Sequence, residues 1–498
     1  MSNEHEWRIG RREFLKGLGA GAATVALGAG LAGCSSNKQP DGKTDTNAQR
    51  IAGETPVGFS KQTDVLIVGT GIAGMSAAIQ PLKAGKKVLL IDKMGYFGGE
   101  SSLSCGFFNI AGSKYQQGFG IKLTIEEQWE KVQGFYADAK DDLDYFKEMY
   151  FGQTEWCDVV TQDFGVKWQP LEEYAGDGQH DTMLLPERGI GDLSALFDPF
   201  QAGLTALGAE FIGSMRALDF IVDGQGTPLG VRCRDEKDGK IVDIEAKCIV
   251  LATGGFSCNQ ELVTAYLPQQ ARKGPLTVGS MGEGHIMASS LGGAYNRMDE
   301  AANLMSDLAQ VTVWGYFGPN VQVTPQGKRF IKEDQSHDSP DKAAELELGY
   351  WWTIFDEQLI TGSQKWNVEQ NMQSNPERLV EGNTLAELAA GMGIEAAVLE
   401  QTFAEYDAAV AAGEDPLGKK RYLLSLKAPY YAMKHFVHRY KTHGGLKISA
   451  RHELLNAKGE PIPNVFMVGS TVADTGSDLA PNAGSGYVCG KYVTEALA

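Results

Sequence analysis

The chain has 498 residues, of which 43% are hydrophobic and 22% are charged; this is typical of a globular protein long enough for two domains. Its net charge of −18 argues against a nucleic-acid partner, because phosphate binding requires a basic surface. The seven cysteines form no CxxC pair and no CxxCH motif, so we expect no metal site, c-type haem or iron–sulfur cluster.

The N-terminal segment has the pattern of an export signal. Arg11–Lys16 reads Arg-Arg-Glu-Phe-Leu-Lys and precedes an apolar run of small residues that ends at Cys34. The order resembles a twin-arginine signal, and the run is too short to be a good membrane-spanning helix. The residues before Cys34 resemble a lipobox, which leaves two alternatives open, a lipid anchor at Cys34 or a simple cleavage site. We therefore assign 1–34 to the signal, expect an extracytoplasmic protein that meets the membrane only through this signal or anchor, and interpret the polar segment 35–61 as a flexible linker.

A complete strand–helix–strand unit follows. Asp64–Val68 is a β-branched run typical of a buried parallel strand, Gly69–Gly74 reads GxGxxG, Met75–Ala84 has helical character, and Lys87–Ile91 is a second buried run. This order is that of a dinucleotide-binding unit, in which the helix N-terminus faces the phosphates.

Each position of this unit has a physical role. Gly69 permits the tight turn, Gly71 lets the backbone approach the pyrophosphate, and Gly74 lets the helix pack closely on the strand. Asp92 ends the second strand, where a carboxylate can accept a hydrogen bond from a ribose hydroxyl. In three later segments, a strand pattern or a turn is followed by glycines. Together these segments fit one extended cofactor that crosses the sheet edge. They are Gly98–Ser102, Ile249–Phe256 and Val465–Gly469, followed by a small-residue helix that opens at Ala483–Gly486.

Together these residues resemble the fumarate reductase and succinate dehydrogenase flavoprotein family. The resemblance is to its soluble branch, with flavocytochrome fumarate reductases, urocanate reductases and 3-ketosteroid dehydrogenases, and it runs from about Thr63 to the C-terminus. Beyond the GxGxxG unit, the residues that carry it are Gly98–Ser102, Ala252–Phe256, Gly282–His285, Gly327–Phe330 with Glu333, and Thr442–Leu446.

The resemblance implies an α/β fold with a Rossmann-like, GR2-type FAD-binding domain and an inserted α+β capping domain. We place the FAD-binding domain at 62–300 and 441–498 and the capping domain at 300–440, with a helix from Ile394 to Ala411. It also implies non-covalent FAD. The cofactor-binding candidates are Gly69, Gly71, Ala73, Gly74, Asp92, Lys93, Gly98, Gly99, Ser101, Ser102, Ala252, Thr253, Gly254, Glu283, Gly469, Ser470, Gly484 and Ser485.

Some of these candidates depart from the family pattern. Glu283 stands where the family has an aspartate, which keeps a hydroxyl-accepting carboxylate but changes its reach. Ser470 stands where the family usually has a glutamate, so one flavin contact is altered. The resemblance places Gly484 and Ser485 at the N-terminus of a helix that points at the flavin, where the positive dipole end stabilises the anionic reduced form.

The resemblance makes Arg329 the candidate proton donor for alkene reduction. Its structural alternative is an arginine that pairs with Glu333 or Asp334. His443 replaces a methionine of the family and is the second catalytic candidate, because a neutral imidazole can donate to substrate or flavin; a structural histidine is the alternative.

The groups that bind a dicarboxylate are missing. Trp314–Phe317 replaces a His-Pro-Thr segment, Lys441 replaces a histidine, and the stretch 478–484 lacks an arginine. Because bidentate arginine contacts supply much of the affinity for a carboxylate, we do not expect fumarate as the substrate. The aromatic residues at 314–317 suit a larger, flatter substrate or belong to the core of the capping domain. The steroid branch is matched no better, because Ala480–Asn482 lacks that branch's tyrosine.

Three functions stay open. The first is an exported ene-reductase that uses a small organic acceptor, with electrons from a separate cytochrome or quinone-linked partner. The second is a dehydrogenase that desaturates a ketone or steroid-like substrate toward a quinone. The third is a tethered flavoprotein that carries electrons without its own substrate.

Overall fold

The computed structural model describes residues 49–50, 57–104, 106–136, 143–170, 182–187, 193–275, 279–305, 318–333, 338–361, 369, 372–373, 376–473 and 479–498. The export signal, Cys34, most of the linker, Asp334 and the aromatic segment 314–317 lie outside the described residues. Within the described part of the chain, no helix is long and apolar enough to cross a membrane.

The larger sheet carries the strands that the sequence predicts around the GxGxxG unit. Its order is β1-β8-β9-β10-β2-β3-β7, with β20 beside β10 and β19 beside β20. β2, β3, β7, β10 and β20 run parallel where they pair. The buried apolar residues of β2, β3, β10 and β20 explain why these four strands lie between covering layers. The bounds are β1 Gln49–Arg50, β2 Phe59–Val68, β3 Val88–Ile91, β7 Glu210–Ile212, β8 Met215–Val222, β9 Pro228–Asp235, β10 Ile241–Leu251, β19 Glu453–Leu455 and β20 Pro461–Met467.

The linker is shorter than the sequence predicts. β2 begins at Phe59, so 59–61 belong to the sheet rather than to a flexible segment that extends to 61. Phe59 is buried, and the Gly58 amide donates to Asp243 Oδ2 at 2.9 Å. β1 also pairs with β8 and forms the edge of the sheet, so a short strand interrupts the segment that we expected to be aperiodic.

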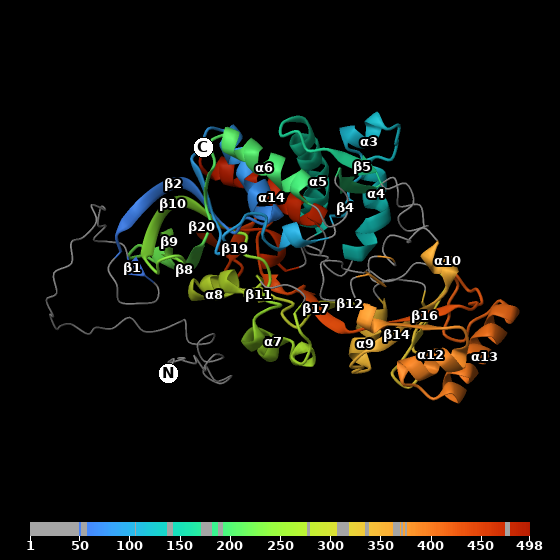
Figure 1. Cartoon of the computed structure of the whole chain (residues 1–498). Helices are drawn as coiled ribbons and strands as arrows, with labels where there is room; N and C mark the ends of the chain where they lie inside the picture. The colour runs from blue at the N-terminus through green and yellow to red at the C-terminus, as the bar shows by residue number, and fades with distance from the viewer. Residues whose placement is uncertain are drawn as a thin grey trace, which may run out of the picture.

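Helices α2 (Ile72–Lys83), α5 (Leu143–Gln162), α6 (Ser194–Ala206) and α14 (Leu479–Ala496) gather on one side of this sheet (Figure 1). Glycines let α14 approach its neighbours closely, because a Cβ on Gly486 would lie 2.0 Å from the Ala73 carbonyl oxygen. α14 begins at Leu479, one turn before the predicted start at Ala483. Pro481 falls in its first turn, where the absent N–H costs no helical hydrogen bond.

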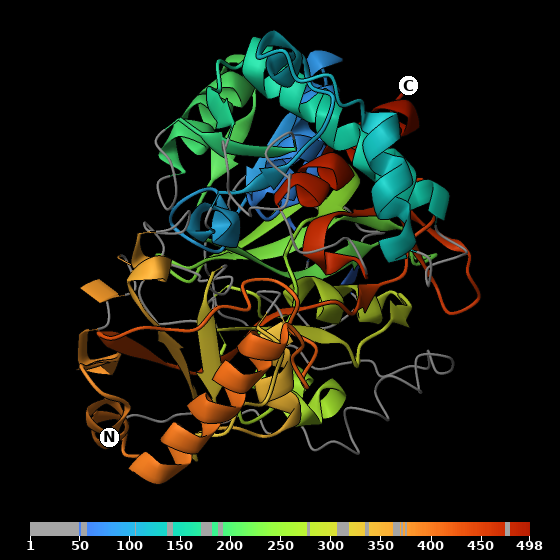
Figure 2. The ribbon, with the colours of Figure 1, turned by 90° about the vertical axis from the view of Figure 1, so that its right-hand side faces the viewer.

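A second sheet lies between residues 320 and 435. Its order is β13-β14-β16-β15, and every pair is antiparallel. α12 and α13 cover one face with Leu388, Phe403 and Tyr406 against Trp352 and Ile354, at the far end of the molecule from the larger sheet (Figures 1 and 2). The bounds are β13 Asn320–Val323, α9 Asp338–Glu345, β14 Trp351–Phe355, α10 Glu357–Ile360, β15 Leu379–Gly382, α12 Leu385–Met392, α13 Ala396–Ala412 and β16 Tyr430–His435.

Two strands connect the two sheets. β12 (Ala301–Met305) leads toward the second sheet, β17 (Val437–Thr442) returns from it, and the two pair antiparallel. α13 confirms the helix predicted from Ile394 to Ala411. The predicted fold class, a Rossmann-like α/β domain with an inserted α+β domain, is confirmed.

The remaining elements lie around the two sheets and between them. They are η1 Gly99–Leu103, β4 Phe108–Asn109, α3 Lys114–Gly118, α4 Ile125–Val132, η2 Gln133–Tyr136, β5 Trp168–Pro170, β6 Met183–Pro186, α7 Gln260–Tyr266, η5 Pro268–Gln270, α8 Glu283–Ser290, β11 Tyr295–Asn296, η6 Pro376–Arg378, β18 Gly445–Leu446 and η7 Gly469–Thr471.

Candidate active site

A long cleft follows the carboxyl-terminal edge of the larger sheet. Its lining begins where four strands end, at Gly69 after β2, Asp92 after β3, Ala252 after β10 and Gly469 after β20. The empty space of the cleft, its open side included, is about 1130 Å³. In open α/β sheets this edge is where ligands bind.

The glycine turn after β2 forms the middle of the cleft floor. Gly69 has a φ of +105°, and a Cβ there would lie 2.2 Å from the Ala252 carbonyl oxygen; a Cβ on Gly74 would lie 2.0 Å from the Gly69 carbonyl oxygen. Gly71 and Ala73 line the cleft, and Gly74 lies behind them. The turn therefore admits only glycine at 69 and 74, and it leaves the N-terminus of α2 open to a ligand.

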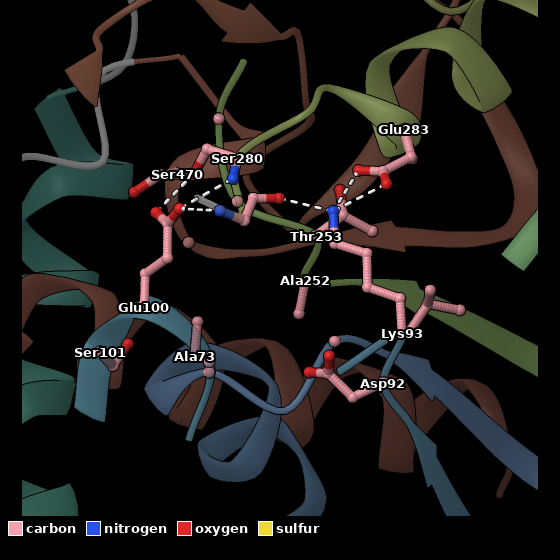
Figure 3. Close-up of a pocket in the computed structure, with 18 of the residues that line it drawn as sticks. Ala73, Asp92, Lys93, Glu100, Ser101, Ala252, Thr253, Ser280, Glu283 and Ser470 are labelled. Atoms are coloured by element: carbon pink, nitrogen blue, oxygen red, sulfur yellow. Dashed lines mark hydrogen bonds and ion pairs between the residues drawn. The ribbon is translucent and has the colours of Figure 1, made fainter. Parts of the chain in front are cut away.

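At one end of the cleft, the β3 end, charged residues are already paired. We define this end by its lining residues Asp92, Lys93, Tyr96, Met215, Arg216, Ala217 and Glu283. Glu283 Oε1 accepts from Lys93 Nζ at 2.7 Å and from Arg216 Nη1 at 2.6 Å, and Figure 3 shows the Lys93–Glu283 contact across the cleft. The predicted hydroxyl acceptor Glu283 thus also neutralises two cations.

Asp92 fixes the glycine turn from the same end. Its Oδ2 accepts from the Thr70 amide at 2.8 Å and from Thr70 Oγ1 at 2.7 Å, while Oδ1 accepts from the Met94 amide at 2.9 Å. The carboxylate lies at the end of β3, where the sequence predicts it, and it lines the cleft.

Between the two ends, Glu100 joins η1 to the segment that precedes α8. Its Oε1 accepts from the Gly279 and Ser280 amides at 2.8 Å each, and its Oε2 accepts from Ser280 Oγ at 2.6 Å (Figure 3). Ser101, which also lines the cleft, accepts from the Ile72 amide at 3.1 Å through its hydroxyl. Gly98 and Ser102 lie behind this surface, and Ser102 Oγ donates to the Gly99 carbonyl oxygen at 2.8 Å.

The opposite end, the β17 end, is made by segments far apart in the sequence. We define it by its lining residues Gly255, Ser257, Lys441, Thr442, Ser470 and Asn482. Thr442 Oγ1 accepts from the Phe256 amide at 3.2 Å, and a Cβ on Gly255 would lie 2.4 Å from that hydroxyl oxygen. β17 is therefore held against the turn after β10, where Thr253 and Gly254 also line the cleft.

The predicted helix-start residues lie behind the β17 end. Gly484 is pressed against α5, and Ser485 is completely buried, where its Oγ accepts from the Gly469 amide at 3.4 Å. Because α14 begins at Leu479, Gly484 and Ser485 fall in its second turn, and Asn482 takes the place on the cleft surface that we expected for them.

Arg329 lies in the second sheet's domain and is absent from the described lining of the cleft. Its guanidinium donates to Asp415 Oδ1 at 2.6 Å and to Glu333 Oε2 at 2.7 Å, and it stacks on the Tyr406 ring at 4.8 Å. Burial lowers the pKa of Arg329, but the hydrogen bonds to Glu333 and Asp415 outweigh it and raise the pKa above the ordinary value. This geometry matches the structural alternative and makes Arg329 a weaker acid; its catalytic role stays a prediction.

His443 follows β17 and is half-buried beside the β17 end. Burial lowers its pKa to about 4, helped by the charge of Lys441 and opposed by that of Glu300. The imidazole is therefore neutral at pH 7, as the sequence-based hypothesis requires, although His443 is not among the described lining residues.

A family comparison decides which ligand this cleft takes. The sequence model of the FAD binding domain matches residues 64–486. The chain belongs to this FAD-binding family. Its cofactor is FAD, and the chain is an FAD-dependent oxidoreductase related to reductases of C=C bonds.

Similar proteins include two curated reductases and a solved flavocytochrome. The urocanate reductase of Eggerthella lenta is 28% identical over 84% of this chain and 72% of the relative. A probable fumarate reductase of Shewanella frigidimarina is 27% identical over 83% of this chain and 70% of the relative. The open conformation of a flavocytochrome c3 fumarate reductase superposes with a TM-score of 0.72 at 25% identity, covering 88% of this chain and 79% of that one.

The residues of the cleft fit FAD. The N-terminus of α2 and the turn Gly69–Gly74 form a cradle that a Cβ would fill, as a pyrophosphate site requires. The pyrophosphate would occupy the middle of the cleft, the β3 end, with the Asp92 carboxylate, would hold the adenosine, and the β17 end would hold the isoalloxazine. The strand-end signals predict the middle of this FAD site.

Sequence reasoning missed several lining residues. Arg216 comes from an antiparallel strand, Ser257 and Ser280 from irregular segments, and Glu100 from the interior of a short motif. Glu100 lies inside the Gly98–Ser102 motif, and that motif was the sequence signal that could have identified it. For Arg216, Ser257 and Ser280, no spacing rule predicted a place in the cleft.

Proposed function

We propose that this FAD-dependent oxidoreductase reduces an activated C=C bond of a small organic acceptor other than fumarate. The observation that carries the proposal is the composition of the β17 end, where the isoalloxazine would lie. Its described lining residues include one cation, Lys441, and no arginine. The named reductases among the relatives support alkene reduction, and the absence of a guanidinium from this described lining supports a substrate with fewer carboxylates than fumarate.

The chain's own residues would organise the reaction. When bound and reduced, FAD supplies the hydride for one alkene carbon. Thr442 and Gly255 hold β17 against the flavin end of the cleft, and a neutral His443 adds no second positive charge beside Lys441. The substrate then needs a carbonyl or a single carboxylate to polarise its alkene, because the described lining of the β17 end holds no arginine that could clamp a second carboxylate.

The proposal extends to the setting of the reaction. No histidine or cysteine is among the described residues that line the cleft, which supports non-covalent FAD. The twin-arginine pattern at Arg11–Lys16 supports export, and the lack of a haem motif supports a separate cytochrome or quinone-linked electron donor.

The test is an anaerobic assay with the purified, FAD-loaded protein. A reduced viologen dye supplies electrons, and its reoxidation is followed against fumarate, mono-enoates, aromatic enoates, enones and sulfoxides. We expect turnover with a mono-enoate or enone and none with fumarate. Turnover with fumarate alone would contradict the substrate class. Oxidation of saturated ketones with a quinone acceptor, without alkene reduction, would instead establish the dehydrogenase alternative.

A further inference from the structure

A buried arginine lies directly behind the β17 end of the cleft. Arg439 belongs to β17 and is 1% exposed. Its Nε donates to the Ser257 carbonyl oxygen at 2.6 Å, and its Nη1 donates to the Gln270 carbonyl oxygen at 2.7 Å. Because Ser257 lines the β17 end, the backbone of this serine separates the guanidinium from the cleft surface.

An irregularity of β17 brings Arg439 to this place. The pairing of β17 with β12 skips Tyr440, which is therefore the extra residue of a β-bulge. Side chains alternate along a regular strand, and the extra residue turns Arg439 to the side on which Thr442 lies. Both side chains reach the turn after β10. Thr442 accepts from the Phe256 amide there, and Arg439 donates to the carbonyl of the next residue, Ser257.

The charge of Arg439 has no counter-charge in the described part of the chain. The groups that hold the guanidinium are neutral backbone carbonyls. Arg232 is equally buried but pairs with Asp243 at 2.6 Å, and Arg329 pairs with two carboxylates. A buried charge without a partner costs free energy, so an anion placed near Arg439 would be stabilised by it.

The β17 end is where such an anion would lie. The isoalloxazine would occupy this end, and reduced FAD carries a negative charge there in its anionic form. Phe256 and Ser257, which lie between the guanidinium and the cleft, are both buried. Protein rather than water therefore fills the intervening space, so the field of the guanidinium is weakly screened.

We propose that Arg439, which touches neither substrate nor cofactor, sets the redox potential of the bound flavin by stabilising its anionic reduced form. Two electrons from the external cytochrome or quinone-linked donor and one proton from water enter the flavin, and the product keeps one negative charge. Arg439 gives up no proton. The higher potential makes the flavin a stronger acceptor for the donor's electrons.

Four variants of the full FAD-loaded protein test this role. Arg439→Met removes the charge, Arg439→Gln removes the charge but keeps an amide that can donate to a carbonyl, and Arg439→Lys keeps the charge. Arg451→Met is the control, because the Arg451 side chain is 50% exposed. FAD content and the midpoint potential at pH 7 are measured for each. We expect Arg439→Met and Arg439→Gln to lower the potential by about 30 mV, which is about tenfold in a two-electron equilibrium. Arg439→Lys and Arg451→Met should stay near the wild type.

The wild type supplies a second measurement that does not depend on how the variants fold. If reduction takes up one proton for two electrons, the midpoint potential falls by about 30 mV per pH unit around pH 7. A fall of about 60 mV per pH unit would mean that the reduced flavin is neutral, and the proposed role of Arg439 would be wrong. Loss of FAD from Arg439→Met and Arg439→Gln would leave this slope to decide.

Three other results would overturn the role of Arg439. Wild-type potentials in FAD-loaded Arg439→Met and Arg439→Gln would show that the charge does not act on the flavin. A potential that is lowered in Arg439→Met but restored in Arg439→Gln would assign the effect to the hydrogen bond, and an equal shift in Arg451→Met would assign it to the net charge of the protein. The potential needs no substrate, so a wild type that reduces no alkene would defeat the proposed function alone.

Discussion

At the scale of single residues, Arg329 is held by two carboxylates whose side chains are completely buried, Glu333 and Asp415. Removal of the guanidinium would leave both carboxylates in the core with Lys419, 3.4 Å from Glu333, as the nearby cation. We therefore expect Arg329→Met to lower the free energy of unfolding by about 3–5 kcal/mol, the usual cost of breaking a buried ion pair from one side. Urea unfolding at pH 7 measures this change.

The control for this variant is Arg451→Met. Arg451 pairs with Glu495 at 2.7 Å, but both side chains are at least half exposed, so its loss should cost less than about 1 kcal/mol. The variant Arg329→Lys supplies the decisive comparison for catalysis. If Arg329→Lys folds stably and yet loses all turnover, the structural role is insufficient and the catalytic prediction for Arg329 is restored.

At the scale of elements, α14 depends on glycines for its contact with α2. A Cβ on Gly486 would lie 2.0 Å from the Ala73 carbonyl oxygen, a distance that forces the two helices apart. Both helices contribute to the cleft, through Ala73 and Asn482. We expect Gly486→Ala to lower stability by about 1–3 kcal/mol or more and to weaken FAD binding, measured by thermal unfolding and by FAD retention on dialysis.

Gly224→Ala is the matched change at an open position. No atom lies within 4 Å of a Cβ on Gly224, and its φ is not positive, so this variant should keep wild-type stability and FAD content. A Gly486→Ala variant that behaves like Gly224→Ala would show that the contact between α2 and α14 relaxes without cost, and that the cleft does not depend on it.

The elements also show where sequence reasoning succeeds and where it stops. The places of Gly69, Gly74 and Asp92 at the cleft follow from local pattern alone, because the order of strand, GxGxxG turn, helix and second strand predicts where each of them lies. Arg216 could not be predicted, since its place in the cleft depends on the register of β8 against β9, which is irregular between Ala217 and Asp219. The start of α14 was predicted one turn late, at Ala483, because the prediction followed the small-residue segment; Pro481 lies in the first turn of the helix, which tolerates proline.

At the scale of the whole molecule, buried histidines make the fold sensitive to acid. Burial lowers the pKa values of His285, His443 and His452 to about 4, whereas in the unfolded chain a histidine titrates near 6.5. As pH falls below about 6.5, the unfolded chain binds protons that the folded protein does not, so stability is full above that pH and is lost progressively until about pH 4. Each completely buried histidine can contribute ~3 kcal/mol to this loss, and urea unfolding at pH 7, 6 and 5 should reveal it.

The pH slope can be assigned to one ring by substitution. His285 is completely buried between Phe256 and Tyr295, so His285→Phe keeps an aromatic ring there while removing the titrating group. The variant should lose less stability than the wild type between pH 7 and pH 5, whatever its stability at pH 7. Because the cause is burial rather than surface charge, the wild-type slope should persist at 0.5 M salt. A slope that salt abolishes, or that His285→Phe leaves unchanged, would assign the acid sensitivity to surface charge or to other groups instead.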